Sequence, residues 1–450
     1  MSFSVRSKPL ITAAFIFASQ AGAQGTTPTP LTLGDAARLA ARQSAPVLIA
    51  QLQTRQAQAR VTQARADLLP TLRSSALESG HTLNSATFGF SFPAAEGEEP
   101  LLDPNGQIIG PVNTLDLRAH VTVPAIDFAA RERVGVARAS VRASEASAQS
   151  ASEQAAATAA IAYLRAARAQ ALVAARQADS TLADSLVIIA NEQLRAGVGV
   201  GLDVTRARSQ LAAVHSQLIA ARGEQSRSLL DLIRAIGAPL DMTFALATTV
   251  DAGVPGESPP SEAEAVAIAM RQRADLAAAE RSLEAARQGA KAIRAERLPT
   301  LSAFADDGAI GTSTAHMLNT YTWGVELSLP IFDGSRRSGK LSEQQAVASQ
   351  LDVQRRELER TVTVEVRSAL LDLGVARDQV QAARGRLNLA QQEYSQAQDR
   401  FRAGVSGNAD VVTAALSLNA ARNQVIDAVT SYQAARVGLA RAEGIATQIP

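Results

Sequence analysis

Two helical runs with a seven-residue apolar repeat flank a short turn, and this feature constrains the fold more than any other. Alanine stands three positions after every member of the repeat except Phe401, which Gly404 follows. A seven-residue period stays buried only if the two helices supercoil left-handedly. Because residues 402–410 form only a short turn, we predict an antiparallel coiled-coil hairpin. The repeat consists of Val366, Leu373, Val380, Leu387, Tyr394 and Phe401, then Val411, Leu418, Val425, Tyr432 and Leu439.

The composition favours an extended helical architecture. The chain has 450 residues, of which 46% are hydrophobic, many of them alanine. So few large side chains cannot build two ordinary compact cores. The formal net charge is +1, and Arg and acidic residues are scattered along the helices, which argues against nucleic acid as a partner. Without cysteine, neither a disulfide framework nor a lipid-bearing Cys is expected.

The N-terminus has the features of a secretory signal. Basic Arg6 and Lys8 precede an apolar run over residues 10–18, and Ala21-Gly22-Ala23 fits a cleavage site. The alternative is an anchoring helix, but the run is shorter than the roughly 20 residues that span a bilayer. We therefore predict that residues 1–23 are removed from a protein exported to the periplasm or beyond.

Four landmarks occur twice in the same order. Residues 65–72 resemble 294–301, and each copy is followed by a strand that ends at proline. Leu329-Pro-Ile-Phe-Asp resembles the sequence at 123–127. The Arg-Ala-Gly before Asp203-Val204 is repeated before Asp410-Val411. Such ordered self-similarity indicates an internal duplication.

Each half also contains two candidate strands, at 71–92 with 115–123 and at 300–311 with 321–329. Alternation of apolar and polar residues over about ten positions is typical of a membrane barrel strand, although a half-buried strand of a soluble sandwich alternates in the same way. Four strands cannot close a barrel, and an open edge is not tolerated in lipid, so several copies must contribute. The residues predicted to face lipid are Phe88, Phe90, Phe92, Leu117, Val121, Tyr321, Trp323, Val325 and Leu327.

The helices predict a tube. Residues 128–196 lack proline and can form one helix about 100 Å long. Shorter helices at 46–69 with 202–236, and at 262–297 with 408–442, together match that length. We expect the fold class to be mainly α with β, a long coiled-coil α-helical tunnel joined to a membrane β-barrel.

These doubled motifs resemble the TolC-like outer-membrane efflux proteins over nearly the whole mature chain. The resemblance implies a homotrimer with a barrel of twelve strands in outer-membrane lipid, continuous with a periplasmic helical tunnel. It also implies a periplasmic adaptor protein and an inner-membrane pump as partners, for efflux or type I secretion. Opening would be an untwisting of the coiled-coil hairpins at the periplasmic tip. Adaptor docking would involve Gly197, Val198, Gly201, Leu202, Gly404, Val405 and Ser406.

Asp203 and Asp410 are the candidate gate residues. The resemblance implies acidic rings near the tip that constrict the lumen and favour cations, but Thr413 stands where a second ring would lie. Both aspartates also fall in the first turn of a helix, where a carboxylate interacts with free N–H groups whatever its function. Gly197 and Gly404 follow long helices, where a left-handed residue is expected as a cap.

No residue pattern predicts catalysis or a cofactor. The stretch 334–340 nearly spells a phosphate-binding loop, but Leu341 replaces the required Ser or Thr. The four histidines, His81, His120, His215 and His316, lack metal-ligand spacing. We therefore expect no metal, no cofactor and no enzyme, with a soluble periplasmic coiled-coil adaptor or scaffold as the alternative function.

The predicted organisation follows the duplication. It comprises a signal peptide (1–23), linker and helices (24–70), a strand pair (71–124), a helical hairpin (125–236), a link (237–260), a helix (261–298), a strand pair (299–330), a second hairpin (331–443) and a tail (444–450).

Overall fold

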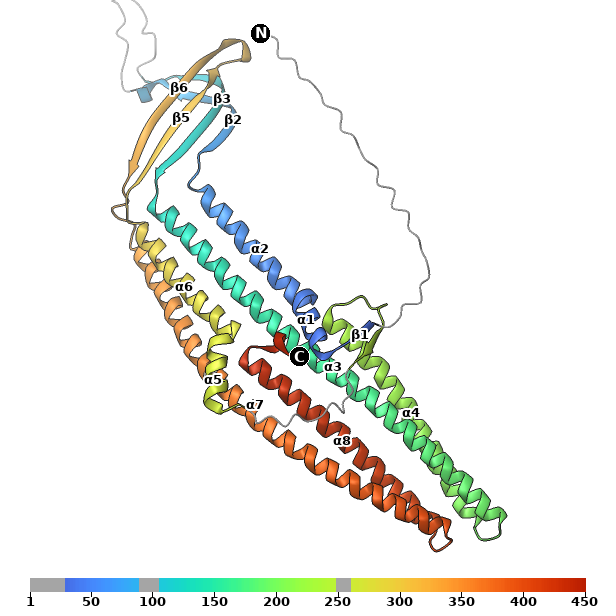
Figure 1. The fold of residues 1–450 in the computed structure, drawn as a ribbon. Helices are drawn as coiled ribbons and strands as arrows, with labels where there is room; N and C mark the ends of the chain where they lie inside the picture. Colours follow the sequence, from blue (N-terminus) through green and yellow to red (C-terminus); the bar gives the residue numbers. More distant parts are fainter. Residues whose placement is uncertain (1–28, 89–104, 248–259) are drawn as a thin grey trace, which may run out of the picture.

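A computed structural model describes residues 29–88, 105–247 and 260–450. Four strands form a sheet at one end, and helices extend from it to two hairpin turns at the other (Figure 1). Within the described residues no helix is both long and apolar enough to cross a membrane. The helices are α1 (Leu33–Gln43), α2 (Ala45–Ala66), α3 (Phe128–Arg195), α4 (Gly201–Ile236), α5 (Glu262–Gln272), α6 (Ala274–Ala295), α7 (Arg336–Arg402) and α8 (Asn408–Glu443). The strands are β1 (Thr29–Leu31), β2 (Thr71–Asn84), β3 (Ile108–Ile126), β4 (Phe244–Leu246), β5 (Thr300–Gly311) and β6 (Met317–Ser328).

The large sheet is antiparallel, in the order β2-β3-β5-β6. Its register keeps the two faces distinct, as the alternation in the sequence predicts. One rung joins Val121, Ala305 and Trp323, and the next joins His120, Asp306 and Thr322. One face is therefore predominantly apolar and the other predominantly polar.

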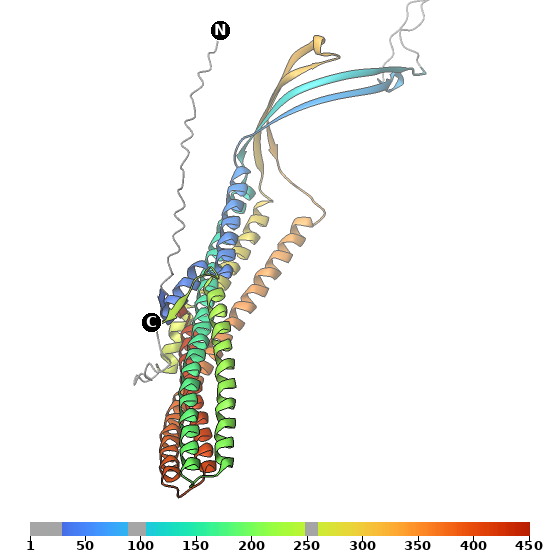
Figure 2. The ribbon, with the colours of Figure 1, turned by 90° about the vertical axis from the view of Figure 1, so that its right-hand side faces the viewer.

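The helices near the sheet follow the order of the strands. α2 leads into β2, β3 into α3, α6 into β5, and β6 toward α7; α3 contacts both α2 and α6, and α6 contacts α7. Toward the hairpin turns the order becomes α4-α3-α8-α7 (Figures 1 and 2). We call this layer of strands and helices the wall; it is open at β2, α2 and α4 on one edge and at β6 and α7 on the other.

Burial along α7 and α8 confirms the predicted coiled-coil hairpin. Val366, Leu373 and Val380 are buried at the predicted spacing, as are Val411 and Leu418 on α8. The α3 helix has 68 residues, which confirms the single long helix predicted between the strands and the first turn. A small parallel pair, β1 with β4, packs with α1 against the middle of α3. Its two strands lie in the segments that the sequence analysis assigned to the linker and helices (24–70) and to the link (237–260).

Three predicted boundaries were wrong. The helix expected at 262–297 is broken at Arg273, whose backbone is extended between α5 and α6. β3 begins at Ile108, before the predicted start of that strand at residue 115. Phe88 lies in a 3₁₀ turn, Ser85–Phe88, after β2 has ended at Asn84, so the period-two pattern was extended too far. Phe90 and Phe92 lie outside the described residues.

Arg273 holds the break between α5 and α6 in place. Its guanidinium donates to both carboxylate oxygens of Asp275, at 2.6 and 3.0 Å, to Glu365 of α7 and to the carbonyl of Ala442 at the end of α8. Burial opposes the charged form of Asp275, but the hydrogen bonds and charge of Arg273 outweigh it and lower the pKa of that carboxyl. The break between α5 and α6 is therefore a charged joint that also bonds to α7 and α8.

Glu443, beside the same joint, predicts a pH-dependent stability. Burial, and secondarily the charge of Glu264, raise the pKa of this carboxyl. A raised pKa means that the protonated form favours folding below the unfolded pKa of about 4.3 and that this contribution is lost as pH rises through the folded value. Glu443→Gln should therefore stabilise the protein by about 1 kcal/mol at pH 8 and by almost nothing at pH 4.

Denaturant unfolding followed by circular dichroism at both pH values measures this difference. Glu262→Gln is the control, because Glu262 is exposed and forms only a surface ion pair with Arg367 at 2.7 Å. Its substitution should change stability by less than about 0.5 kcal/mol. Equal effects of Glu443→Gln at the two pH values would contradict the burial argument.

Candidate functional site at the hairpin tips

The two hairpin turns share one capping geometry. Gly197 and Gly404 have φ of 77° and 70°, in the left-handed region, which confirms the prediction that they cap α3 and α7. In each turn the residue after the glycine donates back to the helix: Val198 N–H to the carbonyl of Gln193 at 3.1 Å, and Val405 N–H to that of Arg400 at 3.0 Å. The duplicated Arg-Ala-Gly motif thus encodes two identical helix ends.

Gly404→Ala should destabilise the second hairpin by about 1–2 kcal/mol, because a Cβ is unfavourable at positive φ. Gly374→Ala is the matched control on the same helix, since no neighbouring atom lies within 4 Å of the place that a Cβ would occupy and its backbone is helical. That change should instead stabilise by about 0.5–1 kcal/mol. Thermal unfolding by circular dichroism compares the two, and a Gly404→Ala protein as stable as the parent would contradict the assigned cap.

The two candidate gate residues occupy different environments. Asp203 lies in the first turn of α4, partly buried, with its carboxylate 3.9 Å from the Arg206 guanidinium. Asp410 lies in the first turn of α8, is exposed, and forms no ion pair with any residue that the structure describes. Of the two, Asp410 therefore presents the unshielded charge at the tip.

Side chains from each hairpin bond to the backbone of the other. The Gln193 amide donates to the carbonyl of Phe401 at 2.7 Å, and the fully buried Asn408 donates to the carbonyl of Asp203 at 2.8 Å. The Asn408 carbonyl oxygen and the Ser406 hydroxyl are buried without a hydrogen-bond partner among the described residues. Sequence analysis missed Gln193 and Asn408, because an amide in a helix or turn carries no pattern that reveals its long-range partner.

The predicted docking residues lie at the tip, and some of them are exposed apolar side chains. Val198, Leu202 and Val405 are exposed, together with Val200 from the same turn. Gly201 is the first residue of α4 and Ser406 precedes α8. The tip thus presents exposed apolar side chains between Arg195, Arg400 and Arg402, which are also exposed.

The predicted lipid-facing residues of the described strands share one face. Cross-strand pairing aligns Leu117 and Val121 of β3 with alanines of β5, and those alanines in turn pair with residues of β6. Tyr321, Trp323, Val325 and Leu327 alternate along β6 and are exposed. On the other face His120 contacts the carboxylate of Asp306, and its second ring nitrogen lies 2.9 Å from the Thr122 hydroxyl. No cluster of potential metal ligands occurs among the described residues.

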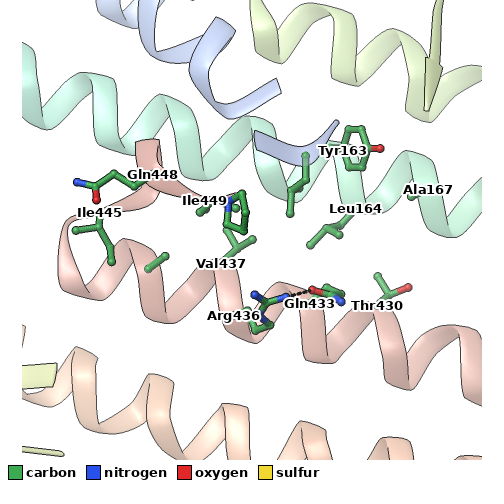
Figure 3. Close-up of a pocket in the computed structure, with 13 residues that line it drawn as sticks. Tyr163, Leu164, Ala167, Thr430, Gln433, Arg436, Val437, Ile445, Gln448 and Ile449 are labelled. Atoms are coloured by element: carbon green, nitrogen blue, oxygen red, sulfur yellow. Dashed lines mark hydrogen bonds between the residues drawn. The ribbon is translucent and has the colours of Figure 1, made fainter. Parts of the chain in front are cut away.

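Two further features lie away from the hairpin tips. A cavity of about 250 Å³ lies between α3 and α8, with Leu164, Val437 and Ile449 pointing into it (Figure 3). The stretch that resembles a phosphate-binding loop is a corner between β6 and α7, where Asp333 accepts from the Arg337 guanidinium at 2.6 Å. The Asp333 pKa is lowered mainly by this hydrogen bond. Neither feature brings reactive side chains together.

Comparison with known proteins gives a consistent result. The sequence profile of the outer membrane efflux protein family matches residues 37–238 and 266–444. The probable efflux pump outer membrane protein TtgC of Pseudomonas putida is 26% identical over 263 residues, covering 55% of this chain and 51% of TtgC. The alkaline protease secretion protein AprF of Pseudomonas aeruginosa is 24% identical over 247 residues, covering 53% of this chain and 51% of AprF. The chain therefore aligns with about half the length of these curated relatives.

The fold has solved counterparts. The CmeC outer membrane channel of Campylobacter jejuni superimposes with a TM-score of 0.74 at 18% identity, covering 92% of this chain and 86% of CmeC. At that identity the likeness concerns the fold alone. It confirms the predicted combination of a long helical body with a four-stranded sheet.

Proposed function

Because the chain belongs to the outer membrane efflux protein family, we propose that it is the exit duct of a tripartite efflux or type I secretion system. Family membership places it in the outer membrane of a Gram-negative cell, with a large periplasmic part. The family consists of ducts rather than enzymes. In this proposal the chain passively conducts substrate that an inner-membrane pump and a periplasmic adaptor deliver.

The observation that carries the proposal is the open wall. The strands of the sheet and the helices that continue from it follow the same order, so the sheet and the helical part end at the same two edges of the wall. A sheet with unpaired edges cannot remain open in lipid. Further copies of the chain would close the sheet and the helical part at once. Three copies of four strands give a barrel with more strands than the smallest known membrane barrels, which have about eight.

The helical edges carry complementary second stripes. On α7, exposed apolar residues form a stripe centred about 150° around the helix from the buried seam: Val364, Leu371, Val375 and Leu389. On α4 the corresponding stripe lies about 150° from its seam, carries no charge and is mostly small. It consists of Thr205, Ser209, Ala212, Ser216, Ile219, Gly223, Ser226 and Leu230. Large residues on one edge would pack into small ones on the edge of the next copy, forming a homotrimer.

The tip supplies the proposed gate and docking site. Asp410 would line the closed lumen, and its exposed charge would favour cations. Asp203 is a weaker candidate, because its carboxylate is partly buried near Arg206. Adaptor hairpins would dock on the apolar surface of Val198, Leu202 and Val405. The lipid-facing role of Leu117, Val121 and the β6 residues belongs to the same proposal.

Membrane fractionation followed by electrophoresis of unheated and boiled samples tests the duct. The protein should remain in the outer membrane until detergent is added, migrate as an oligomer when unheated, and form pores in planar bilayers. Asp410→Asn should then lower the preference of these pores for cations without changing the migration of the unheated oligomer in electrophoresis. A protein that is washed from membranes as a monomer would refute the proposal and favour a soluble adaptor.

A further inference from the structure

A broad groove lies between α4 and α8, with α3 as its floor. Its volume is about 760 Å³, within the range of about 300–1,000 Å³ that is usual for ligand sites. The floor is apolar where Ala157, Ile161 and Ala162 of α3 line it. The charged side chains that line the groove are Arg165, Arg168, Glu224, Asp231, Arg234 and Arg441. An apolar floor and charged walls therefore occur in one groove.

Most of these charges are already paired. The ion pairs in and beside the groove are Arg227 with Glu224 at 2.9 Å, Arg234 with Asp231 at 3.8 Å, and Arg168 with Asp427 at 2.7 Å. The two remaining arginines, Arg165 and Arg441, are exposed. Among the residues that the structure describes, neither guanidinium has an ion-pair or hydrogen-bond partner. The groove thus carries a surplus of two positive charges.

Arg165 and Arg441 lie at nearly the same height above the hairpin turns. Arg165 precedes Gly197 by 32 residues, and Arg441 follows Gly404 by 37 residues. At 1.5 Å per residue these separations are about 48 and 55 Å along the helices. The two guanidiniums line one groove from neighbouring helices, so a single ligand can reach both.

The groove lies on the face of the wall opposite to the small second layer of α1, β1 and β4. Tyr163, two residues before Arg165 and so about 160° around α3, is buried under that layer and donates to the carbonyl of Leu31 in β1 at 3.0 Å. Three copies of the helices α4, α3, α8 and α7, about 9 Å apart, would form a ring with an inner radius of about 12 Å. A layer one helix thick, about 10 Å, would fill such a lumen. The second layer must therefore lie outside the ring, and the groove inside it.

The chemistry of the groove favours an anion with an apolar body. A guanidinium binds a carboxylate or phosphate through paired, charge-assisted hydrogen bonds, and a sulfonate offers the same kind of oxygens. The apolar floor contributes little to the binding of a small inorganic ion but can bury an aromatic or aliphatic body. The groove therefore fits organic anions better than inorganic anions or cations.

We propose that this groove is a binding site for organic anions, in which Arg165 and Arg441 hold the anionic group and the floor on α3 supports the apolar body. Anionic cargo would then meet one such site of each chain on its way through the lumen. The statement about the lumen rests on the proposed function, whereas binding to the groove of a single chain does not.

Binding of pyranine, a pyrene that carries three sulfonates, tests the site. Its fluorescence anisotropy is followed during titration with the full chain in a neutral maltoside detergent at low salt, where charges are least screened. The double variant Arg165→Gln, Arg441→Gln should bind at least about tenfold more weakly, since it lacks both unpaired cations. Because both side chains are exposed and unpaired, the substitutions should leave the fold intact, which circular dichroism checks.

Arg436→Gln is the matched control for Arg441→Gln, because it removes the same charge from α8 on the other face of the wall. Arg436 precedes Arg441 by five residues, about 140° around the helix, and lines the cavity between α3 and α8 (Figure 3). Arg441→Gln alone should weaken pyranine binding at least about threefold, and Arg436→Gln should change it by less than about 1.5-fold.

Two competitors of equal charge test the role of the apolar floor. Naphthalene-1,5-disulfonate and inorganic sulfate are both dianions, but only the first has an apolar body. It should displace pyranine at a concentration at least about tenfold lower than sulfate, because its rings are buried on α3. Equal competition by the two would overturn the assignment to organic anions. Parent-like affinity in the double variant would overturn the proposal, as would equal losses in Arg441→Gln and Arg436→Gln.

Planar bilayers test where the groove lies in the assembled protein. Under a gradient of potassium chloride, pores of the double variant should shift their reversal potential toward that of potassium, because positive charge has been removed from the lumen. Lost pyranine binding with an unchanged reversal potential would overturn the placement of the groove in the lumen. A chain that binds pyranine as predicted but forms no pore would refute the export duct and keep the binding site.

Discussion

Replacing Leu371 and Val375 together by aspartate should abolish assembly of the proposed trimer. Both side chains are exposed in the single chain, at 70% and 56%, and belong to the second stripe of α7. In the closed ring this stripe would be buried against α4 of the next copy, where a carboxylate finds no cation within the uncharged stripe. Each unpaired polar group would cost at least about 2 kcal/mol, and every one of the interfaces would carry two.

The measurement is the oligomeric state in detergent, by light scattering and unheated electrophoresis. Ile219→Asp, on the opposite edge of the wall, should cause the same loss, because Ile219 would face the α7 stripe. Leu416→Asp is the matched control: Leu416 is 51% exposed, but it lies on α8, inside the wall rather than at an edge. If the Leu371→Asp, Val375→Asp protein formed trimers as stable as those of the parent, the copies would have to meet along another surface.

The same stripe explains why the single chain leaves so much apolar surface exposed. A monomeric soluble protein rarely exposes large contiguous apolar patches. Here exposed apolar residues run along β6, with Trp323 and Leu327, and down α7, with Leu371 and Leu389. Lipid would cover the exposed residues of β6, and a second copy of the chain would cover those of α7. Both sets are at the positions where the wall is incomplete.

Features with a local period were predictable from the sequence. The heptads of α7 and α8 determine which residues are buried in the seam, because a period of seven leaves one possible stripe. The left-handed caps at Gly197 and Gly404 follow from the same local reasoning. The register of the sheet also agrees with the alternation, because shifting a strand by one residue would exchange its two faces.

Features that depend on long-range polar partners were not predictable. Gln193, Asn408 and Arg273 lie in sequence that differs in no local way from solvated helix. Their partners are brought near only by the packing of α3, α4, α7 and α8. The misplaced end of β2 has a similar origin, because Phe88 continues the local alternation while Asn84 is the last residue paired with β3.

The second large effect concerns the joint at Arg273. Helix propensity alone predicts a continuous helix from 262 to 297, so the break requires tertiary contacts to hold it. Arg273 supplies them through bonds to Asp275, Glu365 and the carbonyl of Ala442. Burial disfavours the charged form of Arg273. The hydrogen bonds and charges of its two acidic partners outweigh this effect, so the pKa of the Arg273 guanidinium is raised above its ordinary value. The joint therefore depends on this one cation.

Arg273→Met should destabilise the protein by about 2 kcal/mol at pH 7, below the 3–5 kcal/mol of a fully buried pair because Glu365 remains 36% exposed. The effect should fade in acid. Because the pKa of Asp275 is lowered in the folded protein, its stabilising contribution is present above the unfolded pKa of about 3.9 and is lost as pH falls through the folded value.

Denaturant unfolding between pH 3 and 8 measures this dependence. Arg281→Met is the control, because Arg281 lies on α6 and forms only an exposed pair with Glu284 at 3.0 Å. It should shift stability by less than about 0.5 kcal/mol at any pH. If Arg273→Met were as stable as Arg281→Met, backbone preference and apolar packing alone would have to hold the break between α5 and α6. The charged joint would then be a consequence of the bend rather than its cause.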